Sequence, residues 1–126
     1  MAQRSAAAKS TVRFERKREA ILDAATRILN RKGIKGLTLG DTAAAVDLST
    51  TSVTYYFKRK DDLAAACITR GIETLSDIAE LAVRSGTPTE RLHGFLTRYL
   101  DVLKQTAAGE APPLPIISQL RARTSP

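Results

Sequence analysis

Apolar residues recur at helical spacing between Lys17 and Lys32, which is the first regular pattern in the chain. Steps of three and four residues place them on one side of a helix, and Gly33 follows directly. The apolar positions are Ile21, Ala24, Ala25, Ile28 and Leu29. The pattern predicts a helix over residues 17–32 that ends at Gly33.

Two short helices joined by a tight turn are predicted next. Thr38 and Asp41 have the spacing of a capping box, which starts a helix that ends near residues 46–47. Ser49 is a favourable N-cap for a third helix of roughly two turns. The residues of this third helix that face inward, four positions apart, are Val53 and Phe57.

Two longer amphipathic helices follow. Asp61 and Asp62 place negative charge at the start of a helix that runs to about Arg84, where the helix dipole favours it. The run Thr87-Pro88-Thr89-Glu90 combines an N-cap, a first-turn proline and an acid, and so starts a fifth helix. Its apolar face consists of Leu92, Phe95, Leu96, Tyr99, Leu100 and Leu103. No strand pattern occurs in the sequence, so an all-α fold is predicted.

The regular pattern stops after Gln105. Residues 107–115 contain one glycine and three prolines, which predicts a loop. The apolar residues beyond the loop are Ile116, Ile117 and Leu120. They suffice for one or two helical turns whose apolar face has no matching partner, so we expect the chain to be the N-terminal portion of a longer protein.

Positive charge is concentrated in the first half of the chain. Residues 1–60 contain 13 Lys and Arg against 5 Asp and Glu, a net of +8, whereas residues 61–126 contain 7 against 8, a net of −1. Such asymmetry is expected when one part of a protein binds a polyanion. Residues 1–16 show little apolar periodicity and are predicted to be a flexible basic arm, which either folds against a phosphate backbone or stays a solvated tail.

Several classes of protein are disfavoured. The sequence has neither the roughly 18 consecutive apolar residues of a membrane helix nor a secretory signal, so a cytoplasmic protein without a membrane partner is expected. The single cysteine, Cys67, has no partner thiol or histidine cluster, so neither a metal site nor a cofactor is expected, and His93 is expected at the surface. Because no catalytic arrangement of carboxylates, glycines or Ser-His-Asp is present, an enzyme is not predicted.

The two short helices have the pattern of a helix-turn-helix, whose second helix enters the major groove of DNA by its N-terminal end. Small hydroxyl side chains there bond to base edges, while threonine methyl groups contact thymine. The residues of this kind are Thr50, Thr51, Ser52 and Thr54. Tyr55, Tyr56 and Lys60 follow at positions suited to bind phosphates. The alternative interpretations are a solvated helix face and, for the tyrosines, part of the core.

This segment resembles the N-terminal DNA-binding domain of the TetR family over about residues 17–68. The likeness is carried by Ile21-Leu22-Asp23-Ala24-Ala25, Gly33, Leu37-Thr38-Leu39, Ala43, Leu48-Ser49 and Val53 through Leu63. The resemblance implies a three-helix DNA-binding domain over 17–60 and a partial ligand-binding and dimerisation domain over 61–126. It also implies that the helix start at Thr38 offers backbone amides to a phosphate.

Four positions depart from the family's usual pattern. Asp47 stands where the turn commonly has glycine, and aspartate is among the least costly substitutes if a positive φ is needed. Thr42 replaces an apolar residue, Thr54 a frequent tyrosine, and Arg59 the usual serine cap of the fourth helix. These departures bear on the base preference more than on the fold.

By the same resemblance, the long helices begin a ligand pocket and a dimer interface. The candidate pocket residues are Ile72, Leu75, Phe95, Tyr99 and Leu103, each of which core packing explains as well. The sequence thus predicts a homodimeric, sequence-specific repressor that binds a palindromic operator in double-stranded DNA and responds to a small-molecule effector. The alternative is a protein-interaction or nucleic-acid-binding module without sequence preference.

Overall fold

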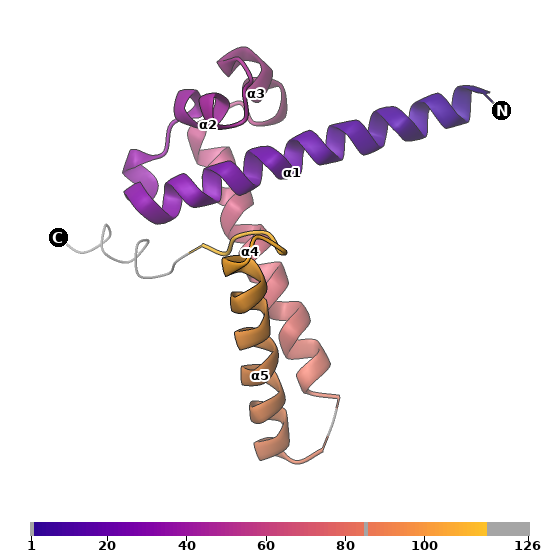
Figure 1. Cartoon of the computed structure of the whole chain (residues 1–126), viewed down its shortest axis with the longest axis vertical. Helices are drawn as coiled ribbons and strands as arrows, with labels where there is room; N and C mark the ends of the chain where they lie inside the picture. The colour runs from indigo at the N-terminus through magenta and orange to yellow at the C-terminus, as the bar shows by residue number, and fades with distance from the viewer. Residues whose placement is uncertain (1, 85, 116–126) are drawn as a thin grey trace.

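The computed structural model describes residues 2–84 and 86–115, and the regular structure in these ranges is entirely helical, which confirms the all-α fold class. The helices are α1 (Ala2–Gly36), α2 (Leu39–Ala45), α3 (Thr50–Tyr56), α4 (Lys60–Ala82) and α5 (Pro88–Ala107). In Figure 1, α4 begins near α3, crosses α1 and continues alongside α5 as an antiparallel pair. None of the described helices has the length and apolar content needed to cross a membrane.

Helix α1 is longer at its N-terminal end than the apolar pattern predicted. Residues 2–16 continue the helix predicted over 17–32, so the structure differs from the expectation of a flexible arm. The segment is rich in alanine, which has the highest helix propensity, and extending an existing helix avoids the cost of nucleation. At the other end the φ of Gly33 is 73°, so the regular helix breaks where the sequence predicted it.

The core lies where α1, α2, α3 and the first half of α4 meet. Its buried side chains are Ile21, Leu22, Ala25, Ile28, Leu29, Leu37, Ala43, Val53, Phe57, Leu63, Ala64 and Cys67. The apolar side of the predicted helix 17–32 is therefore the side that enters the core. Burying a large apolar side chain contributes about 1.5–3 kcal/mol, so this cluster fixes α3 in place against α1 and α4.

Side-chain caps and one left-handed residue define α2 and α3. Thr38 Oγ1 accepts a hydrogen bond from the Asp41 amide at 3.0 Å, and Ser49 Oγ accepts one from the Ser52 amide at 3.1 Å. Both predicted N-caps are confirmed. In the turn between the helices, Asp47 has a φ of 54°, which is the left-handed conformation expected where glycine is usual.

Two further departures from the family's pattern are accommodated locally. Thr42 is fully buried, and its hydroxyl donates to the Thr38 carbonyl at 2.9 Å, which satisfies a polar group inside the core. Arg59 precedes α4 without a side-chain cap, so the acids that follow it provide the favourable charge at this helix start.

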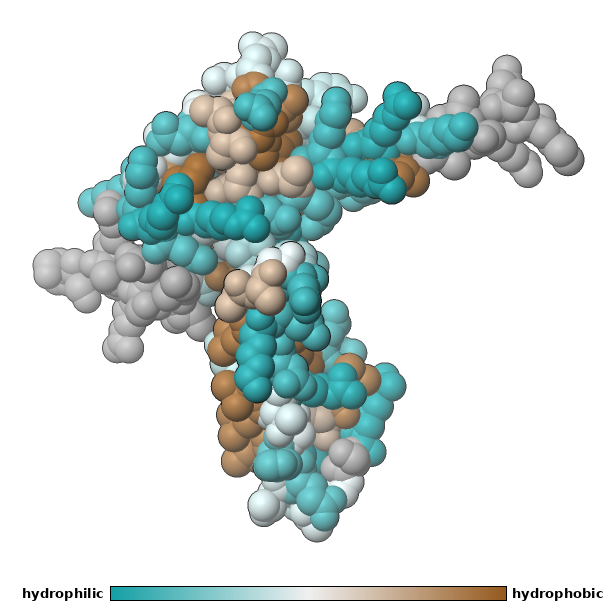
Figure 2. Space-filling model, viewed as in Figure 1, coloured by the Kyte–Doolittle hydropathy of each residue, from teal (hydrophilic) through white to brown (hydrophobic). Residues whose placement is uncertain are grey.

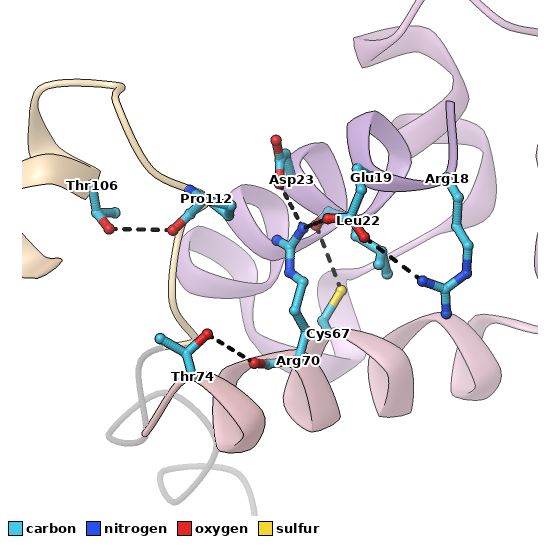
Figure 3. A network of polar contacts seen from close by, with 9 residues as sticks. All are labelled: Arg18, Glu19, Leu22, Asp23, Cys67, Arg70, Thr74, Thr106 and Pro112. Atoms are coloured by element: carbon cyan, nitrogen blue, oxygen red, sulfur yellow. Dashed lines mark hydrogen bonds and ion pairs between the residues drawn. The ribbon is translucent and has the colours of Figure 1, made fainter. Parts of the chain in front are cut away.

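One arginine joins α4 to α1 where the two helices cross. Arg70 Nη1 lies 2.8 Å from Glu19 Oε2 and 2.7 Å from Asp23 Oδ1, as Figure 3 shows. The side chain of Arg70 is 15% exposed, against 30% for Asp23 and 46% for Glu19. The crossing is therefore held by a largely buried charge as well as by the apolar core.

Helix α5 begins as predicted, and its apolar face is largely exposed. Thr87 Oγ1 accepts from the Glu90 amide at 3.3 Å, and Pro88 is the first helical residue. However, no residue of α5 is buried, and its exposed apolar residues are Leu92, Leu96, Leu100 and Leu103. The physical reason is that α5 packs mainly against α4, and one neighbouring helix cannot cover the whole apolar face.

The chain after α5 follows the predicted loop. Residues 108–115 contain no helix or strand, and the Asn30 side-chain amide donates to the Leu114 carbonyl at 2.9 Å, which holds the loop against α1. The apolar turns predicted at Ile116, Ile117 and Leu120 lie outside the described residues.

Candidate nucleic-acid interface

Helix α3 has one side in the core and the other in solvent. Val53 and Phe57 are 0% and 6% exposed, as the sequence predicted. On the outer side Thr50 and Thr51 are exposed, and their hydroxyls make no hydrogen bond to other parts of the described chain. These two hydroxyls are therefore available to bond with another molecule.

The other two predicted reading residues are already hydrogen-bonded within the helix. Ser52 Oγ lies 2.9 Å from Ser49 Oγ, and Thr54 Oγ1 donates to the Thr51 carbonyl at 2.7 Å. Both side chains are half-buried. A hydroxyl oxygen keeps acceptor capacity after donating, so each remains able to accept, but with less freedom to reorient than Thr50 or Thr51.

The tyrosines at the end of α3 belong to an aromatic cluster that the sequence did not reveal. Phe14 of α1 lies 4.7 Å from the Tyr56 ring and 6.1 Å from the Tyr55 ring, and the two tyrosines are 5.4 Å apart. Tyr55 is 75% exposed, whereas Tyr56 is half-buried. The available signal was that Phe14 lies seven residues before Ile21, which places it on the same side of α1 as this core residue.

The predicted phosphate contacts at Lys60 and Thr38 already have partners within the chain. Lys60 Nζ donates to the Lys35 carbonyl at 3.3 Å, an exposed contact across the end of α1. The Thr38 hydroxyl caps α2. An ammonium group has three N–H donors, so Lys60 retains two that can bind a phosphate. For Thr38 the predicted phosphate contact is made by the backbone amides at the start of α2 and not by the hydroxyl.

The predicted pocket residues lie on α4 and α5, the two helices that pack side by side. Phe95 and Tyr99 are half-buried with stacked rings 6.2 Å apart, and Leu75 is half-buried too. Ile72 and Leu103 are 58% and 37% exposed. A small cavity of about 170 Å³ lies nearby and is lined by Arg70, Gly71, Thr74, Val102, Gln105 and residues 111–114. The five candidates form part of the α4–α5 surface.

Cys67 is a buried residue of α4 and is 0% exposed. Its thiol is 3.7 Å from the Leu22 carbonyl, and burial raises the pKa of the Cys67 thiol above its usual range near 9. Among the described residues no group of three or more His, Cys, Asp or Glu is placed to hold a metal ion.

Three comparisons with known proteins agree with this geometry. A solved structure titled "Molecular basis for control of antibiotic production by a bacterial hormones" aligns with a TM-score of 0.58 at 24% identity, over 80% of this chain and 60% of that chain, which shows a common fold. An uncharacterised HTH-type transcriptional regulator from the dhlA 5′ region of Xanthobacter autotrophicus is 43% identical over 54 residues. The alignment covers 43% of this chain and 27% of that relative, so the chain spans less than two thirds of the length of either protein.

The family comparison coincides with the helix-turn-helix and the helices around it. Residues 21–67 match the family described as bacterial regulatory proteins, tetR family. This range runs from the first core residue of α1 to Cys67 in α4 and includes the whole of α2 and α3. Residues 21–67 are therefore similar to the members of the tetR family of bacterial regulatory proteins.

Proposed function

We propose that this protein is a DNA-binding transcriptional regulator that reads the major groove with α3. The observation that carries the proposal is the two-sided character of α3. Val53 and Phe57 anchor it in the core, while Thr50 and Thr51 stand in solvent with unused hydroxyls. Short polar side chains let the helix approach base edges closely, and their hydroxyls donate and accept hydrogen bonds there.

The charge of the surrounding chain supports the same function. The excess of +8 over residues 1–60 lies in the half that contains α3. Basic residues provide the sequence-independent part of DNA affinity, and base contacts add the specificity. We assign the phosphate contacts around α3 to Tyr55, Tyr56 and Lys60, and the base contacts to Thr50, Thr51, Ser52 and Thr54.

A homodimer on a palindromic operator follows from the size of the reading helix. The seven residues of α3 extend about 10 Å, which matches about three base pairs of B-DNA. A site of three base pairs occurs too often in a genome to specify one gene. A homodimer with two-fold symmetry reads two such half-sites and so doubles the number of base pairs recognised. As further parts of the proposal, the protein acts as a repressor in the cytoplasm, and a small molecule on the α4–α5 side controls it, because α4 contacts both α1 and α5.

Selection from a random duplex library by the full chain tests the proposal. The expected result is one enriched palindromic motif, and Thr51→Val changes the preferred base at one position in each half-site. The matched control is Thr97→Val, which makes the same chemical change on the exposed surface of α5. If no motif is enriched and the affinity is equal for all duplexes, the protein is instead a nucleic-acid-binding module without sequence preference.

A further inference from the structure

We infer that Phe14 of α1 is a positioning residue for Tyr55 and Tyr56, which rests on the proposed function of α3. It holds both tyrosine rings in the orientation in which their hydroxyls bind phosphates of DNA. Phe14 acts on DNA binding through the two rings that it contacts. A residue outside the helix-turn-helix thus takes part in DNA binding.

The rings of Phe14, Tyr55 and Tyr56 form an aromatic cluster in which each ring contacts the other two. The Phe14 ring lies 4.7 Å from the Tyr56 ring, at an angle of 30°, and 6.1 Å from the Tyr55 ring, at 80°. The two tyrosine rings lie 5.4 Å apart at 87°. Aromatic rings attract at centroid separations of about 4.5–7 Å and favour edge-to-face or offset arrangements. Each tyrosine is therefore held by two aromatic neighbours, one of which is Phe14.

The cluster holds the tyrosine rings and leaves their hydroxyls unused. Within the described part of the chain, neither the Tyr55 nor the Tyr56 hydroxyl makes a hydrogen bond. Tyr55 is 75% exposed although its ring has two aromatic neighbours. A phenolic hydroxyl can donate a hydrogen bond to a phosphate oxygen. The ring contacts thus fix the direction of two donors whose hydrogen-bonding capacity is free for another molecule.

Phe14 reaches the tyrosines because α1 is helical through residues 2–16. It is the one member of the cluster that lies outside α3. One helical turn later, the Arg18 guanidinium lies 5.4 Å from the centre of the Phe57 ring, which holds α1 against the end of α3 at a second point. Figure 2 shows hydrophilic side chains standing out from α1 on the side where α2 and α3 lie. The N-terminal extension of α1 therefore brings an aromatic ring to the end of the reading helix, at a polar surface.

Phe14 contributes to this cluster and not to the hydrophobic core. It is 37% exposed, and the buried core where α1, α2, α3 and α4 meet consists of other residues. Substitutions outside a core usually change stability little. Removal of the Phe14 ring is therefore expected to change the order of the tyrosines far more than the stability of the fold.

The size of the effect on DNA binding follows from the freedom that the tyrosines regain. Ordering one flexible side chain on binding weakens affinity by about 2- to 10-fold. In Phe14→Ala both tyrosines have to be ordered by the DNA, so the affinity should fall by about 5-fold or more. The Tyr55 hydroxyl should contribute a factor of about 5-fold in the wild-type protein, which is typical of one hydrogen bond.

A double-mutant cycle on DNA affinity tests the coupling between the Phe14 ring and the Tyr55 hydroxyl. The probe is a duplex that carries the motif enriched by the wild-type protein, and fluorescence anisotropy gives the Kd of each variant of the full chain. Tyr55→Phe removes only the hydroxyl. It is expected to weaken binding by about 5-fold in the wild-type protein and by under about 2-fold in Phe14→Ala, because a ring that is no longer held directs its hydroxyl poorly.

Phe14→Tyr keeps the ring and is expected to keep the wild-type affinity. The matched control is Val12→Ala, which truncates an exposed apolar side chain of the same helix segment and should leave the affinity unchanged. Circular dichroism is expected to show equal helix content in all variants. If Phe14→Ala loses helix, Phe14→Leu replaces it in the cycle, because leucine keeps the apolar bulk without an aromatic ring.

Equal effects of Tyr55→Phe in the wild-type and Phe14 variant backgrounds overturn the inference. Failure of the wild-type protein to prefer any motif instead overturns the proposed function, so the two failures are distinct.

Discussion

Replacing Arg70 by methionine tests how α4 is fixed to α1 and, through α1, to the helix-turn-helix. The change keeps most of the apolar stem of the side chain and removes the charge that lies 2.8 Å from Glu19 and 2.7 Å from Asp23. It also leaves the two carboxylates one helical turn apart on α1 without a counter-charge. We expect loss of stability and looser attachment of α4 to α1.

The size of the effect follows from the burial of the three groups. Two unit charges about 4 Å apart attract by about 4 kcal/mol at an effective dielectric constant of about 20, and by about 1 kcal/mol in water. Desolvation offsets part of this attraction for a side chain only 15% exposed. We therefore expect about 1–1.5 kcal/mol from the Asp23 pair and about 0.5 kcal/mol from the more exposed Glu19 pair. With about 0.3 kcal/mol of repulsion between the acids, Arg70→Met costs about 2 kcal/mol.

Urea unfolding followed by circular dichroism measures these terms in a double-mutant cycle. Asp23→Asn should cost about 1–1.5 kcal/mol in the wild-type protein and under about 0.3 kcal/mol in the Arg70→Met background. Arg98→Met is the control, because it removes an exposed arginine from α5. If Asp23→Asn costs the same in both backgrounds, the ion pair does not hold the crossing and the argument is refuted.

Three further predictions concern single residues. Because Asp47 has a φ of 54°, Asp47→Gly should stabilise the protein by about 0.5 kcal/mol and Asp47→Ala should destabilise it by about 1 kcal/mol, as measured by urea midpoints. Leu63→Ala should cost about 2–5 kcal/mol, since Leu63 is 0% exposed, and a loss under 1 kcal/mol would contradict the described core. Burial raises the pKa of the Cys67 thiol, so above about pH 9 the thiol ionises in the unfolded chain but not in the folded one. The free energy of unfolding should therefore decrease as pH rises above about 9, and Cys67→Ala should make this decrease smaller.

The sequence was informative wherever structure depends on neighbouring residues. Thr38, Ser49 and Thr87 start their helices as predicted, because a side-chain cap involves residues only three positions apart. The conformation of Asp47 was also predictable, since a turn that usually requires glycine imposes a positive φ on any substitute. Local chemistry was thus sufficient for the helix-turn-helix.

The contacts that orient the candidate interface could not be predicted in the same way. The pairing of Phe14 with Tyr55 joins residues 41 positions apart, and that of Arg70 with Glu19 joins residues 51 positions apart. Which residues meet over such distances depends on how the helices cross. The exposed face of α5 has a similar origin, because periodicity identifies an apolar side without showing how much of it a neighbour covers.

The two attachments of α1 lie on different sides of the helix and only a few residues apart, with consequences for motion. Phe14 and Arg18 contact the end of α3, whereas Glu19 and Asp23 contact α4. Because α1 contacts both helices, we expect a tilt of α4 to move α1 and α3 together as one rigid unit. Lys9 lies about 21 Å along the helix from Asp23, so a tilt of about 5° displaces it by about 2 Å, enough to lengthen a hydrogen bond past its limit.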